Sequence, residues 1–224
     1  MIVFIDIETV PTEDEEIIKA FEDSITAPAQ YKKPESIAEW MVENKDAAVK
    51  ELIRKTSFDA LYGRIVCIGL AFDDEPPMAI YGDDEKDLLQ RLNDEISGHT
   101  GFGSPRGFVD SFCGHNIHGF DLPFLKQRSF IKNVRPHHKL IQAMDAKPWA
   151  DIVFDTMLKW SPERDKKVSM DKLCKALGID GKGDMDGSMV AETWKVDKEK
   201  VAEYCKDDVH KVRQIYRRLT FAGE

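Results

Sequence analysis

The alternation of apolar and polar positions predicts a buried strand at the start of the chain. Residues 1–10 read MIVFIDIETV, and both faces of this segment are apolar as far as Asp6, which is typical of a strand covered on both sides. Side chains alternate along a strand, so Asp6 and Glu8 point to one face. Two carboxylates therefore lie at or near an interior, where they need a cation to neutralise them.

Similar patterns predict the remaining elements. RIVCIGLAF (residues 64–72), PMAIYG (residues 77–82) and GFVDSFCGHN (residues 107–116) read as strands, the first two joined by a turn. Apolar stripes at helical spacing predict helices over residues 84–96, 122–131, 169–178 and 197–219. Ser169 is expected to cap the third of these helices and Gly178 to end it. A glycine-rich loop is predicted over residues 98–107. Together these elements describe a mixed-sheet α/β or α+β domain.

Residues 11–62 separate the first two strands, and this segment is too long for an ordinary connection between strands. Its residues are charged and helix-prone. We interpret them as a helical insertion within a single domain over residues 1–224. The insertion is either a packed cover, the favoured reading, or a wall of a substrate groove. With 224 residues, 42% of them hydrophobic, the chain is long enough for one sizeable α/β core.

Composition narrows the classes of function. A formal charge of −9 argues against a general basic surface that coats nucleic acid, although a local basic channel is compatible with it. The four cysteines are widely spaced without a Cys-x-x-Cys pair, which favours reduced core thiols over a disulfide framework or a zinc site. No segment resembles a membrane span or a signal peptide. We expect no membrane association and a cytoplasmic location.

Two further aspartates stand among apolar residues. Asp121 lies in the run GFDLPFL, where it either caps the following helix or faces a polar pocket together with Asn116. On the last helix Asp208 falls at the centre of the apolar stripe, Asp207 falls to its side, and Tyr204 lies one turn earlier. The alternative role for Tyr204 and Asp208 is a hydrogen bond that merely stabilises the helix.

These four carboxylates predict a site for divalent cations. Hard oxygen ligands select Mg²⁺ or Mn²⁺, and two such ions ~3.5–4 Å apart stabilise the attacking and leaving oxygens of a phosphoryl displacement.

The segments FIDIET, NIHGFD and YCKDD resemble the three motifs of the DEDD superfamily of 3′→5′ exonucleases. Tyr204 resembles the tyrosine subclass (DEDDy), because Glu203 stands where the histidine subclass has histidine. The chain most closely resembles the predicted exonucleases related to the proofreading domain of family B DNA polymerases. Further segments that resemble this family are YGRIVCIGLA, the pair at residues 151–152, LCKALGI and DGSMV. This resemblance implies a ribonuclease H-like fold with a mixed five-stranded sheet and flanking helices.

The resemblance also implies roles for individual residues. Asp6, Glu8 and Asp208 would bind the metal that holds the attacking water, Asp6 would bridge to a second metal, and Asp121 would act on that second ion. Tyr204 would orient the water or help to deprotonate it. The orienting role is favoured, because a phenol with a pKa of ~10 is a poor base at neutral pH. The substrate-binding residues expected from the resemblance and from the local basic patch are Ile7, Thr9, Asn116, Phe120, Lys126 and Arg128. For the two basic residues, a solvated helix face is an equal alternative.

The resulting hypothesis is a stand-alone exonuclease with two Mg²⁺ or Mn²⁺ ions. It would hydrolyse the 3′ end of single-stranded nucleic acid, with DNA favoured, and release nucleoside 5′-monophosphates, alongside possible replication or repair partners. The alternatives are an exoribonuclease, a non-enzymatic binding module, and a haloacid dehalogenase-like phosphatase. The phosphatase is suggested by DIETV, but Glu8 and the spacing from Tyr204 to Asp208 argue against it.

Overall fold

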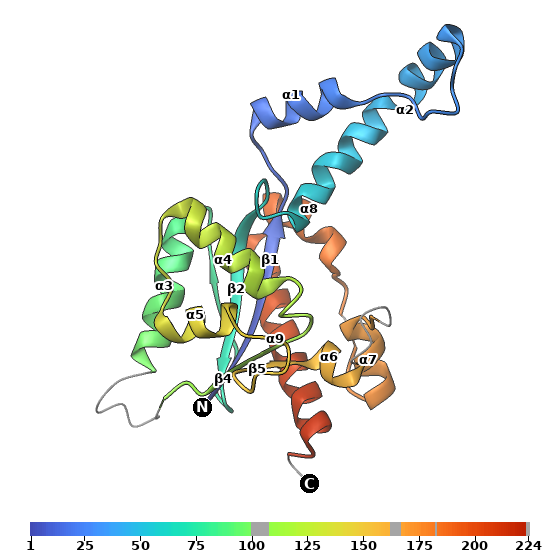
Figure 1. Ribbon diagram of the computed structural model, residues 1–224. Coiled ribbons are helices and arrows are strands. Elements are labelled where there is room, and N and C mark those ends of the chain that lie inside the picture. The colour runs from blue at the N-terminus through green and yellow to red at the C-terminus, as the bar shows by residue number, and fades with distance from the viewer. Residues whose placement is uncertain (100–107, 162–166, 182, 223–224) are drawn as a thin grey trace. The chain divides into compact units, whose positions relative to one another are not determined.

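A computed structural model describes residues 1–99, 108–161, 167–181 and 183–222 (Figure 1). The strands are β1 (Ile2–Val10), β2 (Arg64–Phe72), β3 (Met78–Tyr81), β4 (Ser111–Gly114) and β5 (Val153–Asp155). The α-helices are α1 (Glu15–Ser24), α2 (Pro34–Lys55), α3 (Glu85–Gly98), α4 (Asp121–Lys132), α5 (His138–Met144), α6 (Thr156–Trp160), α7 (Met170–Leu177), α8 (Val190–Val196) and α9 (Lys198–Thr220). The short 3₁₀ helices are η1 (Thr56–Phe58) and η2 (Gly187–Met189). The chain divides into two compact units, one made of Met1–Thr9 with Ile65–Glu224 and the other of Val10–Arg64.

The first unit is built on a mixed five-stranded sheet with the order β3-β2-β1-β4-β5. Strands β1 and β4 are parallel, as are β4 and β5, whereas β2 and β3 are antiparallel. Helices flank this sheet, which confirms the predicted α/β class and is consistent with a ribonuclease H-like exonuclease fold. The sheet places β1, with its two carboxylates, between β2 and β4.

Helix α9 packs along one face of the sheet, where it contacts β3 and β4 (Figure 1). Its residues Val209 and Val212 share a core cluster with Phe4 of β1. Gly69 of β2 makes this close approach possible, because a Cβ atom there would lie 2.7 Å from Val209 Cγ2 and 2.8 Å from Cys205 Sγ. The face of β1 that carries Phe4, Asp6 and Glu8 is therefore the face covered by α9.

The second unit contains α1, α2 and η1, and so places helices where the sequence predicts a helical insertion. Phe21 packs edge-on against Tyr62 with ring centroids 5.4 Å apart, and the Thr12 N–H donates to Thr56 Oγ1 at 2.9 Å. The role of this unit as a cover or a groove wall, and the assignment of residues 1–224 to one domain, stay predictions.

The predicted helix ends are confirmed. Ser169 caps α7 through a bond from the Lys172 N–H, and Gly178 ends this helix in the left-handed conformation with φ +67°. All four cysteines are buried and free of disulfides, as expected of core thiols. In the described ranges, no helix is long and apolar enough to cross a membrane. Most of the predicted glycine-rich loop, residues 100–107, lies outside the described residues.

Candidate active site

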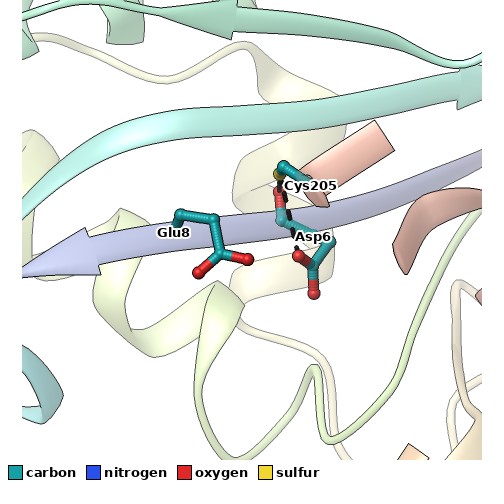
Figure 2. Close-up of side chains that lie close together, drawn as sticks. All are labelled: Asp6, Glu8 and Cys205. Carbon is teal, nitrogen blue, oxygen red and sulfur yellow. Dashed lines mark hydrogen bonds between the residues drawn. The ribbon is translucent and has the colours of Figure 1, made fainter. Parts of the chain in front are cut away.

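Strand β1 presents the first two carboxylates side by side, as the period of two predicts (Figure 2). Glu8 is only 8% exposed. Cys205 of α9 lies against Asp6, with its Sγ 3.7 Å from both the carbonyl oxygen and Oδ2 of Asp6. One ligand atom each from Asp6, Glu8 and Cys205 lies within 4.8 Å of the others. The strand and the helix thus form a compact group of potential metal ligands.

Asp121 joins this group through the backbone of β1. Strand β4 ends at Gly114, and its pairing with β1 aligns Phe4 with Cys113, so the Ile7 N–H lies beyond the paired stretch. Asp121 Oδ1 accepts this N–H at 3.2 Å, at a position where β4 no longer pairs with β1. The N-cap of α4 is Phe120, without a side-chain cap bond. Asp121 therefore connects α4 to β1, and the cap alternative is wrong.

The loop between β4 and α4 is shaped by Asp155 at the end of β5. The carboxylate of Asp155 accepts the N–H groups of Asn116 and His118, each at 3.1 Å. Asn116 has a left-handed φ of +60°, and its carbonyl accepts the N–H groups of Gly119 and Phe120. These bonds turn the chain so that α4 begins with Asp121 beside β1.

Helix α9 presents Asp208 to the interior and Asp207 to the surface, which confirms the predicted helix faces. Asp208 is 4% exposed, whereas the Asp207 side chain is 49% exposed. The phenol of Tyr204, one turn earlier, is hydrogen-bonded to Asp208. Lys211, one turn later, donates to Asp208 Oδ1 at 3.3 Å.

The electrostatics of the site reflect concentrated negative charge. Burial, followed by the charges of Glu8, Asp121 and Asp208, raises the pKa of Asp6 well above its usual range. Burial also raises the pKa of Asp121 to about 7, against the opposing effect of backbone hydrogen bonds. Burial and the nearby Asp208 and Glu8 raise the pKa of Tyr204. Tyr204 thus stays protonated at neutral pH and serves as a hydrogen-bond donor.

These residues fit a divalent cation. The charges of three neighbouring carboxylates raise the pKa of Asp6, and a cation would relieve this repulsion. Carboxylate oxygens suit Mg²⁺ or Mn²⁺, whereas the Cys205 sulfur is a soft donor that these hard ions do not prefer. The cysteine instead donates to oxygen atoms of Asp6. Asp6, Glu8, Asp121 and Asp208 are therefore the residues suited to hold the metal.

The predicted substrate-binding residues have different environments. Ile7 and Thr9 are 4% and 9% exposed, and Phe120 packs near Phe124 with ring centroids 5.4 Å apart. Lys126 forms an ion pair with Asp145 and remains partly exposed. For these residues and for Asn116, the substrate contact stays a prediction.

Arg128 requires a correction. It is 6% exposed, and its guanidinium binds both oxygens of the buried Glu85 at 2.9 and 2.6 Å. Glu85 also accepts the N–H of Ile65 at 2.8 Å. Arg128 and Glu85 together connect α4, α3 and β2. Because its charge is buried and paired, Arg128 does not present a surface charge to substrate phosphates.

Lys211 and Cys205 also belong to the site, although neither was predicted from the sequence. Lys211 is 3% exposed, and it follows Asp208 by three residues on a helix, a spacing that places both side chains on one face. That spacing was a usable signal. The approach of Cys205 to Asp6 depends on how α9 packs against β1, for which the sequence offers no comparable signal.

Comparisons with known proteins agree with this arrangement. Residues 78–223 match the model of a family described as a predicted 3′-5′ exonuclease related to the exonuclease domain of PolB. This stretch includes Asp121, Tyr204 and Asp208 and begins after β1. No curated protein matches the chain.

The fold is also similar to that of a solved structure. The family B DNA polymerase from the hyperthermophilic archaeon Pyrobaculum calidifontis matches with a TM-score of 0.58 and 15% identity, over 98% of this chain. The chain spans 24% of the length of that polymerase. By its family match, and with a fold like that of this polymerase, the chain belongs to the predicted 3′-5′ exonucleases related to the exonuclease domain of PolB.

Proposed function

We propose that the protein is a metal-dependent 3′→5′ exonuclease that removes nucleoside 5′-monophosphates from the 3′ end of single-stranded nucleic acid, with DNA as the favoured substrate. The observation that carries this proposal is the convergence of Glu8, Asp121 and Asp208 on Asp6, whose pKa all three raise. The partly exposed Asp6 and the buried Glu8, Asp121 and Asp208 come from β1, α4 and α9. Together these four carboxylates form an anionic site that suits divalent cations and phosphodiester hydrolysis.

In this proposal Asp6, Glu8 and Asp208 would hold one Mg²⁺ or Mn²⁺, and Asp6 and Asp121 would act on a second. When bound, such ions lower the pKa of water and stabilise the charge that develops on the phosphoryl oxygens. Asp121 is held in place by the Ile7 N–H, so its carboxylate is oriented before a metal or substrate arrives.

Tyr204 acts as an orienting donor. Its pKa is raised by burial and by Asp208 and Glu8, so it keeps its proton and cannot serve as a general base at neutral pH. Its O–H donates to Asp208, and its phenolic oxygen can accept a hydrogen bond from a water molecule near Asp208. This supports the orienting role expected from the resemblance over a role in deprotonation.

The single-stranded substrate, the preference for DNA, the cytoplasmic location and the replication or repair partners belong to this proposal. Nothing in the arrangement of the carboxylates distinguishes deoxyribose from ribose, because that choice depends on contacts to the 2′ position. DNA and RNA are therefore separate arms of the test.

The test uses single-stranded DNA and RNA oligonucleotides labelled at either end, incubated with Mg²⁺, Mn²⁺ or EDTA. The proposal predicts stepwise shortening of the 5′-labelled strand and release of labelled mononucleotide from the 3′-labelled strand, only with metal. Asp6→Asn should abolish both. Internal fragments, or equal activity in EDTA, would contradict it. Degradation of RNA alone would identify an exoribonuclease.

A further inference from the structure

Lys211 is a buried cation inside an otherwise anionic site. Its side chain is 3% exposed, and its Nζ lies 3.3 Å from Asp208 Oδ1 and 2.5 Å from Asp207 Oδ2. Side chains on a helix lean toward its N-terminus, so the ammonium group of Lys211 reaches back over the turn that carries both aspartates. One lysine thus connects the buried aspartate to its exposed neighbour.

The ammonium group is held in its charged form. Its Nζ forms ion pairs with the carboxylates of both Asp207 and Asp208. A buried ammonium costs free energy unless it is paired. Because Asp207 and Asp208 both pair with it, Lys211 is stable at this position only while it contacts them.

Asp208 is therefore held from two sides along α9. Lys211 binds its Oδ1, and the Tyr204 phenol is hydrogen-bonded to its carboxylate. The compact group of ligand atoms found among the described residues consists of Asp6, Glu8 and Cys205, and Asp208 is not part of it. In this structure Asp208 is oriented by Lys211 and Tyr204.

We propose that Lys211 is a positioning residue that fixes the carboxylate of Asp208 for metal binding and competes with the metal for its charge. Two opposite effects follow. The positive charge weakens the attraction of the site for a divalent cation, whereas the hydrogen bond holds Asp208 in the one orientation that supports turnover. Asp207 determines how strongly Lys211 exerts these two effects on Asp208, because both aspartates share its ammonium group.

The test measures Mn²⁺ affinity by isothermal titration calorimetry or electron paramagnetic resonance, independently of nuclease activity. Lys211→Met removes the charge and keeps an unbranched apolar side chain. It should lower the Kd for Mn²⁺ about tenfold, because one positive charge leaves the neighbourhood of the ion. At saturating Mn²⁺ it should lower kcat more than about tenfold, since Asp208 loses its anchor. A purely structural role would not produce tighter binding together with slower turnover.

Three matched variants complete the experiment. Lys211→Arg keeps the charge and should restore the wild-type Kd. Asp207→Asn leaves Lys211 paired with Asp208 alone and should raise the Kd a few-fold, the opposite of Lys211→Met. Lys206→Met removes a lysine of the same helix that pairs with Glu203 and should leave the Kd unchanged.

The proposal is overturned if Lys211→Met leaves the Kd for Mn²⁺ unchanged or raises it in a folded protein, as judged by circular dichroism, or if Lys206→Met tightens binding equally. The kcat measurement rests on the proposed exonuclease function, whereas the affinity measurements do not. Wild-type protein that binds Mn²⁺ with the predicted Lys211 dependence but degrades no nucleic acid would refute the exonuclease function and support the role of Lys211.

Discussion

Asp121 Oδ1 accepts the backbone N–H of Ile7 at 3.2 Å, between two residues that are 114 positions apart. This bond occupies a position along β1 that β4 is too short to reach. It brings the third carboxylate of the site next to Asp6 and Glu8, and it requires Asp121 to be buried. Because β4 does not pair with β1 at Ile7, the Ile7 N–H is available to hold Asp121 at the site.

The stability of the metal-free protein should depend on Asp121. Its pKa of about 7 in the folded protein lies above the value of ~3.9 expected in the unfolded chain. The folded protein thus binds the proton of Asp121 more tightly than the unfolded chain does. The stabilisation from this proton is complete below pH ~4 and is lost as the pH rises to about 7. The slope is about 1.4 kcal/mol per pH unit in this window.

Urea denaturation at pH 5 and pH 8 measures this effect. In EDTA, the free energy of unfolding of wild type relative to Asp121→Asn should fall by about 2.5 kcal/mol between the two pH values. Saturating Mg²⁺ should reduce the difference, because metal binding favours the ionised carboxylate. An equal pH dependence in both proteins without metal would contradict the raised pKa.

The two adjacent aspartates of α9 should differ in their effect on activity. Asp208→Asn places a neutral amide at a buried metal ligand and should reduce Mg²⁺-dependent hydrolysis by at least about 1,000-fold, a loss comparable to that of a major transition-state interaction. Asp207→Asn changes an exposed side chain and should retain most activity at saturating metal. Rates on a 5′-labelled oligonucleotide give the comparison, and equal losses would contradict the assignment of the helix faces.

Asp6→Asn should separate stability from metal binding. Removing a carboxylate that lies beside three others relieves repulsion, so the metal-free variant should be more stable than wild type by about 1 kcal/mol or more. Mn²⁺ should raise the Tm of wild type but not the Tm of the Asp6→Asn variant. Thermal unfolding with EDTA and with a Mn²⁺ series tests both effects, and a normal Mn²⁺ response in the variant would exclude Asp6 as a ligand.

Gly69→Ala should impair the site without altering any of its side chains. The new Cβ would lie 2.8 Å from Cys205 Sγ and 3.0 Å from the Cys205 carbonyl oxygen, so α9 must shift away from β2. We expect a loss of about 1–3 kcal/mol in stability and a lower kcat. Gly98→Ala is the control, because nothing lies within 4 Å of its added Cβ. Equal stability of the two variants, by urea denaturation, would contradict a tight contact at Gly69.

Local periodicity was enough to predict several features of the site. The period of two placed Asp6 and Glu8 on one face of β1, and the helical period placed Asp208 inside and Asp207 outside. The ends of α7 at Ser169 and Gly178 also followed from local chemistry. These features depend on residues a few positions apart, so the sequence by itself determined them.

Other features depended on contacts between distant segments. Arg128 looked like a surface charge until Glu85, 43 residues away, was found to pair with it in the interior. Cys205 reaches Asp6 because Gly69 lets α9 approach the sheet, and Asp121 lies beside β1 because β4 ends early. Only the tertiary structure decided these contacts, since burial and pairing between distant segments are set by packing and strand register, which local sequence patterns do not encode.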